Sequence, residues 1–198
     1  RDHGLTRKQL RGASYRRLTR SVYADRSVPA GREREVTGWM LVLPDDAALY
    51  GPTAAEWYEL PTPKEDDCHV IVPAGGVVPV RRPGLVPHEG LMPDESQDWR
   101  GVQVTVPTRT FLDLAPALSR YALVAAGDAM VRLNLTTPDE LQAAAAAARR
   151  KRGVVLARAA AELVRPGVDS PPETTVRLIL IDGGLPCPET GVDIFDDA

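Results

Sequence analysis

The spacing of apolar side chains changes along the chain, and the changes predict helices in some stretches and strands in others. Residues 32–43 and 53–58 have apolar side chains at helical spacing, so a pair of helices is expected there. Between residues 68 and 106 the period shortens towards two and prolines are frequent, which predicts a meandering sheet. Its strands are expected at residues 69–72, 82–88 and 102–106.

The last of these predicted strands runs directly into a helix. Pro107 cannot donate to a sheet ladder and so ends the strand, while Thr108 is expected to cap the helix that follows. Arg109 and Asp113 are four residues apart and would meet on one helix face, where the simplest expectation is a surface ion pair.

Helical patterns continue at residues 108–118, 120–133, 137–152 and 153–163, so the chain is predicted to belong to the α+β class. Asn134 is expected to end the second of these helices. Thr137 and Glu140 have the spacing of a capping box for the third.

Positive charge is concentrated at the start of the chain. Residues 1–24 hold seven basic side chains and one acidic one, a net charge of +6, so the rest of the chain carries −9. Residues 6–12 predict a short, very basic helix with Thr6 as its N-cap, and residues 15–18 and 21–24 predict the strands of a hairpin. A basic end on an acidic body is typical of a polyanion-binding element attached to another domain.

The composition excludes several classes of protein. With 43% hydrophobic and 26% charged residues it is that of a soluble globular protein. No apolar run approaches the roughly 20 residues needed to cross a bilayer, and the N-terminus is charged, so a cytoplasmic protein without a membrane partner is expected. Cys68 and Cys187 lie far apart, which argues against a disulfide framework or a zinc site. His69 and His88 have no nucleophile or carboxylate at a catalytic spacing and receive no catalytic role.

The pattern R-G-V-x-V-T-x-P-x-R-T-x-L-D-L, at residues 100–114, resembles the centre of actinobacterial proteins related to AbiEi-type antitoxins. The first segment also resembles the N-terminal winged helix of that family, in which a G-L-(S/T)-x-x-x-L helix precedes a W-R-x-L-x-x-G-V-Y wing. Tyr15 stands in place of the tryptophan and Ser21 in place of the glycine. The resemblance implies a partial winged helix-turn-helix whose first helices lie before Arg1, followed by a mixed body of helices and a small sheet.

The same resemblance implies that the first segment contacts double-stranded DNA. The candidate residues are Arg7, Lys8 and Arg11 on the recognition helix and Arg16, Arg17 and Arg20 on the wing. The alternative is that these cations only form a solvated face. A second basic run, residues 149–152, would end the predicted helix 137–152, where positive charge complements the helix dipole, and this explanation is preferred to a second DNA-binding patch.

A new module is predicted from residue 170 onward. Ser170 and Glu173 have the spacing of a capping box for a helix at residues 174–181, and residues 190–195 predict a strand.

The pattern S-P-x-E-x-x-x-R-L-x-L-x-x-x-G-L-P-x-P-E, at residues 170–189, resembles the opening of the Vsr-like endonuclease domain of the PD-(D/E)xK class. The resemblance implies that this helix and strand are the first helix and strand of a restriction-endonuclease-like module. In that class a carboxylate on the first helix contributes to a metal site, so Glu173 is the candidate catalytic residue, and Arg177 also matches the pattern. The main metal ligands are expected after Ala198. No cofactor or metal ligand set is therefore expected in this chain, and Mg²⁺ is expected only in an intact protein.

Three functions remain open from the sequence. The first is a DNA-binding protein of toxin–antitoxin or phage-defence type, a transcriptional autoregulator or antitoxin with DNA and a cognate toxin as partners. The second is a Vsr-like DNA endonuclease whose catalytic half follows this chain, and the third is a protein-binding antitoxin scaffold. The predicted domains are a partial winged helix at residues 1–30, an AbiEi-like body at 31–165 and an incomplete endonuclease module at 166–198.

Overall fold

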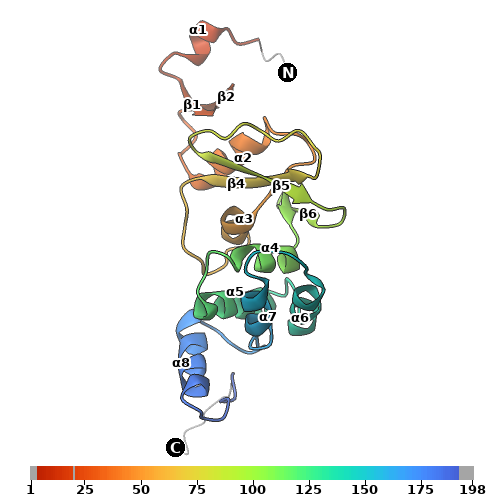
Figure 1. Ribbon diagram of the computed structural model, residues 1–198. Helices are drawn as coiled ribbons and strands as arrows, with labels where there is room; N and C mark the ends of the chain where they lie inside the picture. The colour runs from red at the N-terminus through yellow and green to blue at the C-terminus, as the bar shows by residue number, and fades with distance from the viewer. Residues whose placement is uncertain (1–3, 20, 192–198) are drawn as a thin grey trace, which may run out of the picture. The chain divides into compact units, whose positions relative to one another are not determined.

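Helices and strands both contribute to the fold, as predicted, in the computed structural model, which describes residues 4–19 and 21–191 (Figure 1). Contacts within the chain define two compact units. The sheet unit comprises Arg1–Leu49 and Asp66–Val104, and the helical unit comprises Tyr50–Glu65 and Thr105–Ala198. The domain boundaries predicted after residues 30 and 165 differ from this division, and they stay predictions.

The sheet unit begins with the predicted helix and hairpin, which are α1 (Arg7–Leu10), β1 (Tyr15–Thr19) and β2 (Val22–Asp25). Thr6 caps α1 as expected: its hydroxyl accepts from the Gln9 amide, and the Gln9 side chain accepts from the Thr6 amide at 2.8 Å. The strands are antiparallel, and Ser21 adopts a φ of 67° in the connecting turn. Ser21 thus occupies the left-handed region that glycine favours, at the position where the winged-helix pattern that it resembles has glycine.

A five-stranded mixed sheet forms the rest of this unit, with strand order β5-β4-β3-β7-β6. The elements are α2 (Arg32–Met40), β3 (Ala48–Leu49), β4 (Cys68–Pro73), β5 (Leu85–Leu91), β6 (Ser96–Trp99) and β7 (Val102–Thr105). Helix α2 therefore ends three residues earlier than predicted. The sequence analysis missed β3, which has two residues, and β6.

The prediction of a meander is wrong. Strands β4 and β5 are consecutive but parallel, with Cys68 opposite Leu85 and Val70 opposite Pro87, whereas a meander needs antiparallel neighbours. Residues 74–84 carry the chain back along the sheet, so that β5 starts beside the start of β4. Pro87 is tolerated because β5 is an edge strand, where a missing amide leaves no central ladder bond unmade.

The helical unit holds α3 (Gly51–Trp57), α4 (Pro107–Leu114), α5 (Arg120–Arg132), α6 (Pro138–Ala147), α7 (Val154–Ala161) and α8 (Pro171–Asp182). Helix α5 is its centre, since it contacts α4, α6, α7 and α8. Gly127 on α5 permits this packing: a Cβ there would lie 2.5 Å from a Val164 methyl carbon and 3.1 Å from the Phe111 ring.

The start of α4 corrects one prediction. Helix α4 begins at Pro107 with the extended residue Val106 at its N-cap, so Thr108 lies inside the first turn and does not cap it. Proline is well suited to this first position because the amide it lacks would have no partner there. The Thr110 hydroxyl instead bonds back to Thr105, 2.8 Å from its hydroxyl and 3.0 Å from its carbonyl oxygen.

Arg109 and Asp113 form the predicted pair, but it is buried rather than on the surface. Arg109 Nε donates to both carboxylate oxygens at 2.9 and 2.8 Å, and the two side chains are 8% and 4% exposed. Lys151 Nζ lies 4.0 Å from the same carboxylate. The Tyr50 ring lies 6.0 Å from the guanidinium, and burial, then the Asp113 charge, raises the pKa of Tyr50 to about 12.

The ends of α6 confirm one prediction and overturn another. Thr137 and Glu140 form the expected capping box. The helix ends at Ala147, with Ala148 extended, so the basic residues 149–152 lie in the loop before α7 and not on the last turn of a helix. The dipole explanation for their charge therefore does not apply.

A buried polar cluster ties α8 to α5. Asp128 accepts hydrogen bonds from the Thr174 hydroxyl, the Arg177 guanidinium and the Arg165 amide at 2.7, 2.7 and 2.8 Å. Burial raises the pKa of Asp128, and the three donors, which stabilise the carboxylate, oppose that rise. We name Asp128, Thr174 and Arg177 the Asp128 cluster.

Candidate nucleic-acid interface

Helix α1 presents the three cations that the sequence assigned to DNA recognition. Arg7, Lys8 and Arg11 are all exposed, with Arg11 at the C-cap. Within residues 4–19 and 21–191, no group forms a hydrogen bond or ion pair with these three side chains. The helix is a single turn, about 6 Å long at 1.5 Å per residue. It can therefore offer its charges to a ligand, but over a short distance only.

The hairpin places two further predicted cations on β1. Arg16 is half-buried and donates from Nη2 to the Pro29 carbonyl at 3.2 Å, and Arg17 is exposed and donates from Nε to the Thr19 carbonyl at 3.1 Å. Since a guanidinium has five N–H donors, each arginine keeps donors for a ligand. Arg20, the sixth candidate, lies outside the described residues.

A hollow of about 420 Å³ lies between the end of α1 and the hairpin. It gathers four arginines and two tyrosines, and its lining is Leu10, Arg11, Tyr15, Arg16, Arg17, Tyr23 and Arg26. We name it the basic hollow. Three of the predicted cations therefore meet at one place, whereas Arg7 and Lys8 are not part of the lining.

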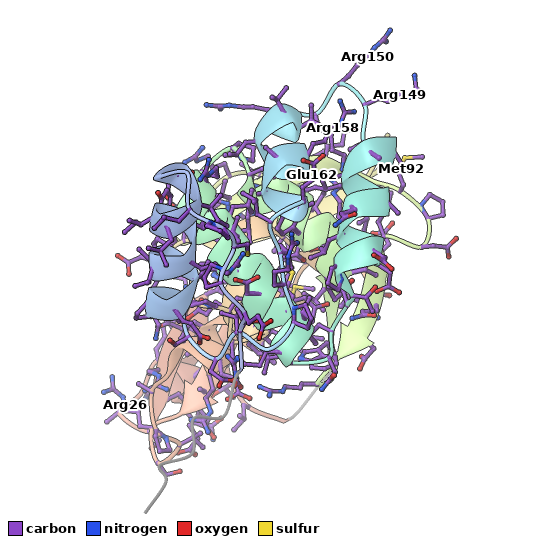
Figure 2. The ribbon with its side chains drawn as sticks, turned by 90° about the horizontal axis from the view of Figure 1, so that it is seen from below. Arg26, Met92, Arg149, Arg150, Arg158 and Glu162 are labelled. Carbon is purple, nitrogen blue, oxygen red and sulfur yellow. The ribbon has the colours of Figure 1, made fainter. Side chains whose placement is uncertain are left out.

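Arg26 was missed by the sequence analysis. It is exposed, is labelled in Figure 2, and donates from Nε to the Tyr15 carbonyl at 3.1 Å. Arg26 could have been found from its position directly after the second strand of the hairpin. A hairpin brings the start of its first strand beside the end of its second, and Tyr15 lies opposite Asp25. The basic segment thus extends beyond residue 24.

Asp25 is the acidic residue nearest to these cations along the hairpin. Its carboxylate accepts from the Ser27 amide at 2.8 Å, and this bond lowers the pKa of Asp25. A charged carboxylate therefore lies at the end of β2, opposite Tyr15 of the hollow's lining, at neutral pH. An anionic ligand would be attracted by Arg11, Arg16 and Arg17 and repelled at the strand end that carries Asp25.

Glu173, the candidate catalytic residue, has a structural contact. Its Oε2 accepts from the Asp169 amide at 2.9 Å, and the Ser170 side chain makes no capping hydrogen bond. The predicted capping box is therefore wrong, since Glu173 reaches past Ser170 to the preceding residue. In the described residues no three His, Cys, Asp or Glu side chains are grouped to hold a metal ion. The predicted strand at residues 190–195 lies mostly outside the described residues.

Sequence spacing also missed a histidine pair in the sheet. His69 on β4 and His88 on β5 stack with ring centroids 5.3 Å apart, and His69 Nδ1 lies 3.1 Å from His88 Nε2. Burial, then the charges of His69 and Arg81, lowers the pKa of His88 to about 4. His88 is therefore uncharged at neutral pH, and it contacts His69 across two neighbouring strands.

Comparison with known proteins identifies the central part of the chain. A family model described as the AbiEi antitoxin C-terminal domain matches residues 46–164. The chain belongs to this family. The AbiEi match begins just before β3 and continues to the end of α7, so it includes the sheet and most of the helical unit. It does not include α1, the hairpin, α2 or α8.

Two curated proteins of Mycobacterium tuberculosis, from strains CDC 1551 / Oshkosh and ATCC 25618 / H37Rv, resemble this AbiEi-family chain. Each is named an uncharacterized protein and is 31% identical to it over 137 residues. The alignment covers 69% of this chain and 49% of each relative, so the chain spans about half the length of the curated relatives it matches. Among the described residues, no helix has both the length and the apolar composition to cross a membrane.

Proposed function

We propose that this protein binds double-stranded DNA within a toxin–antitoxin or phage-defence system, as a transcriptional autoregulator or antitoxin. The observation that carries the proposal is the basic hollow, where Arg11, Arg16 and Arg17 meet Arg26. Membership of the AbiEi antitoxin C-terminal domain family supports the same class of function. A cognate toxin is the second proposed partner.

The two parts of the basic segment would contribute differently to DNA binding. The side chains of Arg7, Lys8 and Arg11 form no hydrogen bond or ion pair within the described part of the chain, so their charges can approach base edges or phosphates. Arg16 and Arg17 are held by backbone carbonyls, which fixes their direction and suits the sequence-independent contacts that a wing makes with phosphates. This division corresponds to a winged helix whose recognition helix is α1.

Titration of a duplex from the protein's own promoter and of a scrambled duplex, at several salt concentrations, tests the proposal. Replacing Arg16, Arg17 and Arg20 together with Ala should weaken binding to both duplexes and flatten the salt dependence, by about 0.9 in the log–log slope for each phosphate that the variant no longer neutralises. Replacing Arg7 or Arg11 should reduce discrimination between the duplexes, by about 1–3 kcal/mol for a bidentate base contact.

Circular dichroism should show that each variant keeps the wild-type fold, and Lys64→Ala, an exposed change in the helical unit, is the matched control. The proposal fails if the triple variant binds as tightly as the wild type at low salt.

The alternative of a Vsr-like endonuclease rests on the resemblance of residues 170–189. Its test is saturable Mg²⁺ or Mn²⁺ binding that Glu173→Gln abolishes without unfolding α8. The contact with the Asp169 amide favours a structural role for Glu173 instead. Glu173→Gln should keep this contact, because the oxygen of an amide side chain can also accept the bond. A protein-binding scaffold, the third candidate, would bind its toxin equally well after all the N-terminal cations had been replaced.

A further inference from the structure

The loop between α6 and α7 carries four successive cations, Arg149, Arg150, Lys151 and Arg152. Lys151 differs from the others because it is half-buried and lies 4.0 Å from the Asp113 carboxylate. The three arginines are exposed, and no group in the described part of the chain forms a hydrogen bond or ion pair with their side chains. Figure 2 shows Arg149 and Arg150 pointing outward from this loop.

These arginines are not needed as donors to the carbonyls at the end of helix α6. Arg158 on α7 already supplies such donors: its Nε donates to the Ala145 carbonyl at 3.0 Å and its Nη2 to the Ala148 carbonyl at 2.8 Å. The last carbonyls of a helix lack partners within the helix, and a cation near them also complements the dipole. The usual structural reason for basic residues after a helix is therefore met by Arg158.

The far end of the loop is fixed by close packing. Gly153 has a φ of 78°, and a Cβ there would lie 2.8 Å from the Pro116 nitrogen and 2.9 Å from the Ala115 carbonyl carbon. Only glycine can approach the segment after α4 so closely. With Arg158 at one end and Lys151 and Gly153 at the other, the loop has a defined position, and its three arginines project from it without a structural role of their own.

We propose that residues 149–152 form a second phosphate-binding surface, at which Arg149, Arg150 and Arg152 contact the backbone of duplex DNA. The inference rests on the proposed DNA-binding function and extends it to a surface outside the N-terminal segment. Guanidinium groups match phosphate oxygens in pairs of hydrogen bonds, and a polyanion relieves the mutual repulsion of adjacent cations.

A protein partner fits this surface less well. Protein interfaces bury a centre that is depleted of charged residues, and here four cations follow one another in the chain. Val155, 77% exposed beside the loop, adds a single apolar side chain. A phosphate backbone needs no apolar centre, only cations that are not already engaged.

The variant Arg149→Gln/Arg150→Gln tests the proposal, with Lys64→Gln/Arg132→Gln as the matched control. The control removes two exposed charges from the same unit without touching the loop. Lys151, Arg158 and Gly153 are kept, so the base of the loop stays intact. Binding to a fluorescent duplex is measured by anisotropy at several salt concentrations for the wild type and both variants, after thermal unfolding has shown similar stabilities.

The loop variant should flatten the log–log salt slope by about 0.9 for each phosphate that it no longer neutralises, equally on promoter and scrambled duplexes. The control should keep the wild-type slope. Combining the loop variant with Arg16→Ala/Arg17→Ala should add the two reductions, because the surfaces are separate in sequence and share no residue.

Three other outcomes would overturn the inference, and they show whether the proposed function falls with it. If the wild type binds DNA and the loop variant has the same slope as the control, the loop surface is not a phosphate site, while the proposed function stands. The same conclusion follows if the loop variant loses an acidic protein partner but keeps its DNA slope. If the wild type binds neither duplex at low salt, the proposed function fails and this inference fails with it.

Discussion

Arginine has opposite roles in two regions of this molecule. In the helical unit, Arg109 and Arg177 are 7% and 2% exposed, and each is paired with a carboxylate of the same unit. At the N-terminal helix and hairpin, Arg11 and Arg17 are exposed. In the described residues, the Arg11 side chain makes no hydrogen bond or ion pair, and the Arg17 side chain donates to a single carbonyl. A desolvated, paired charge contributes to the fold, whereas an exposed and weakly engaged one is available to a ligand.

The largest effect on stability is expected at the Asp128 cluster. Arg177→Met should destabilise the protein by about 3–5 kcal/mol, because it leaves the Asp128 carboxylate buried without its charged partner. The measurement is the free energy of unfolding in urea.

The double variant Asp128→Asn/Arg177→Met is the control, since it removes the uncompensated charge and keeps an oxygen for the Thr174 hydroxyl. It should recover part of the loss. A cost below about 1 kcal/mol for Arg177→Met would mean that this buried arginine behaves like a surface one.

The histidine pair should produce the next largest effect, seen as a dependence on pH. The pKa of His88 is about 4 in the folded state and near 6.5 when unfolded, so the folded state binds the proton more weakly. Stability is therefore fully present above pH 6.5 and falls as the pH drops towards 4. After allowance for partial exposure the loss should be on the order of 1–2 kcal/mol.

Unfolding free energies between pH 7 and 4 measure this effect, and His88→Gln should flatten the profile. The same slope in wild type and variant would show that the carboxylates alone set the acid sensitivity.

Two helix starts with similar sequences should respond differently to the loss of a hydroxyl. Thr137→Ala should cost about 1 kcal/mol, because the Thr137 hydroxyl accepts from the Glu140 amide. Ser170→Ala should change stability by only a few tenths of a kcal/mol, since Ser170 makes no capping bond. Thermal unfolding of the two variants side by side decides this, and an equal loss in both would mean that Ser170 caps α8 in solution.

The smallest effect on stability is expected at the exposed cations. Replacing Arg7, Lys8 and Arg11 together with Gln should change the unfolding free energy by less than about 0.5 kcal/mol. The same variant should bind DNA much more weakly if the proposed function is correct. Paired unfolding and binding measurements make the comparison with Arg177 direct, and a large loss of stability here would remove the distinction between the two regions.

Many of the confirmed predictions concern features that depend only on residues close together in the sequence. The N-cap at Thr6, the capping box at Thr137, the hairpin and the helix stop at Asn134 depend on neighbours within a few residues, and all are present. The capping box at Ser170 was predicted from the same spacing and is absent. Spacing shows which groups can meet, but it does not decide between competing partners such as the Asp169 amide.

Features that depend on distant contacts could not be predicted. The spacing of Arg109 and Asp113 predicted their pairing, but their burial depends on Tyr50 and on neighbouring helices. Strand β3 has two residues, too few to show a period, and the parallel register of β4 and β5 has no local signal. At the basic hollow, the sequence was enough to predict the cations of β1, but placing Arg26 beside them required the register of the hairpin.

The position of β3 also sets an order of events during synthesis. The strand joins the two halves of the sheet, since Leu49 lies opposite Val70 on β4 and opposite Val104 on β7. The ribosome therefore has to translate past Val104 before the sheet can close, and the loop closed at that moment is long and entropically costly. The basic hairpin pairs near neighbours and can form as soon as it leaves the exit tunnel, so it is available while the sheet is still open.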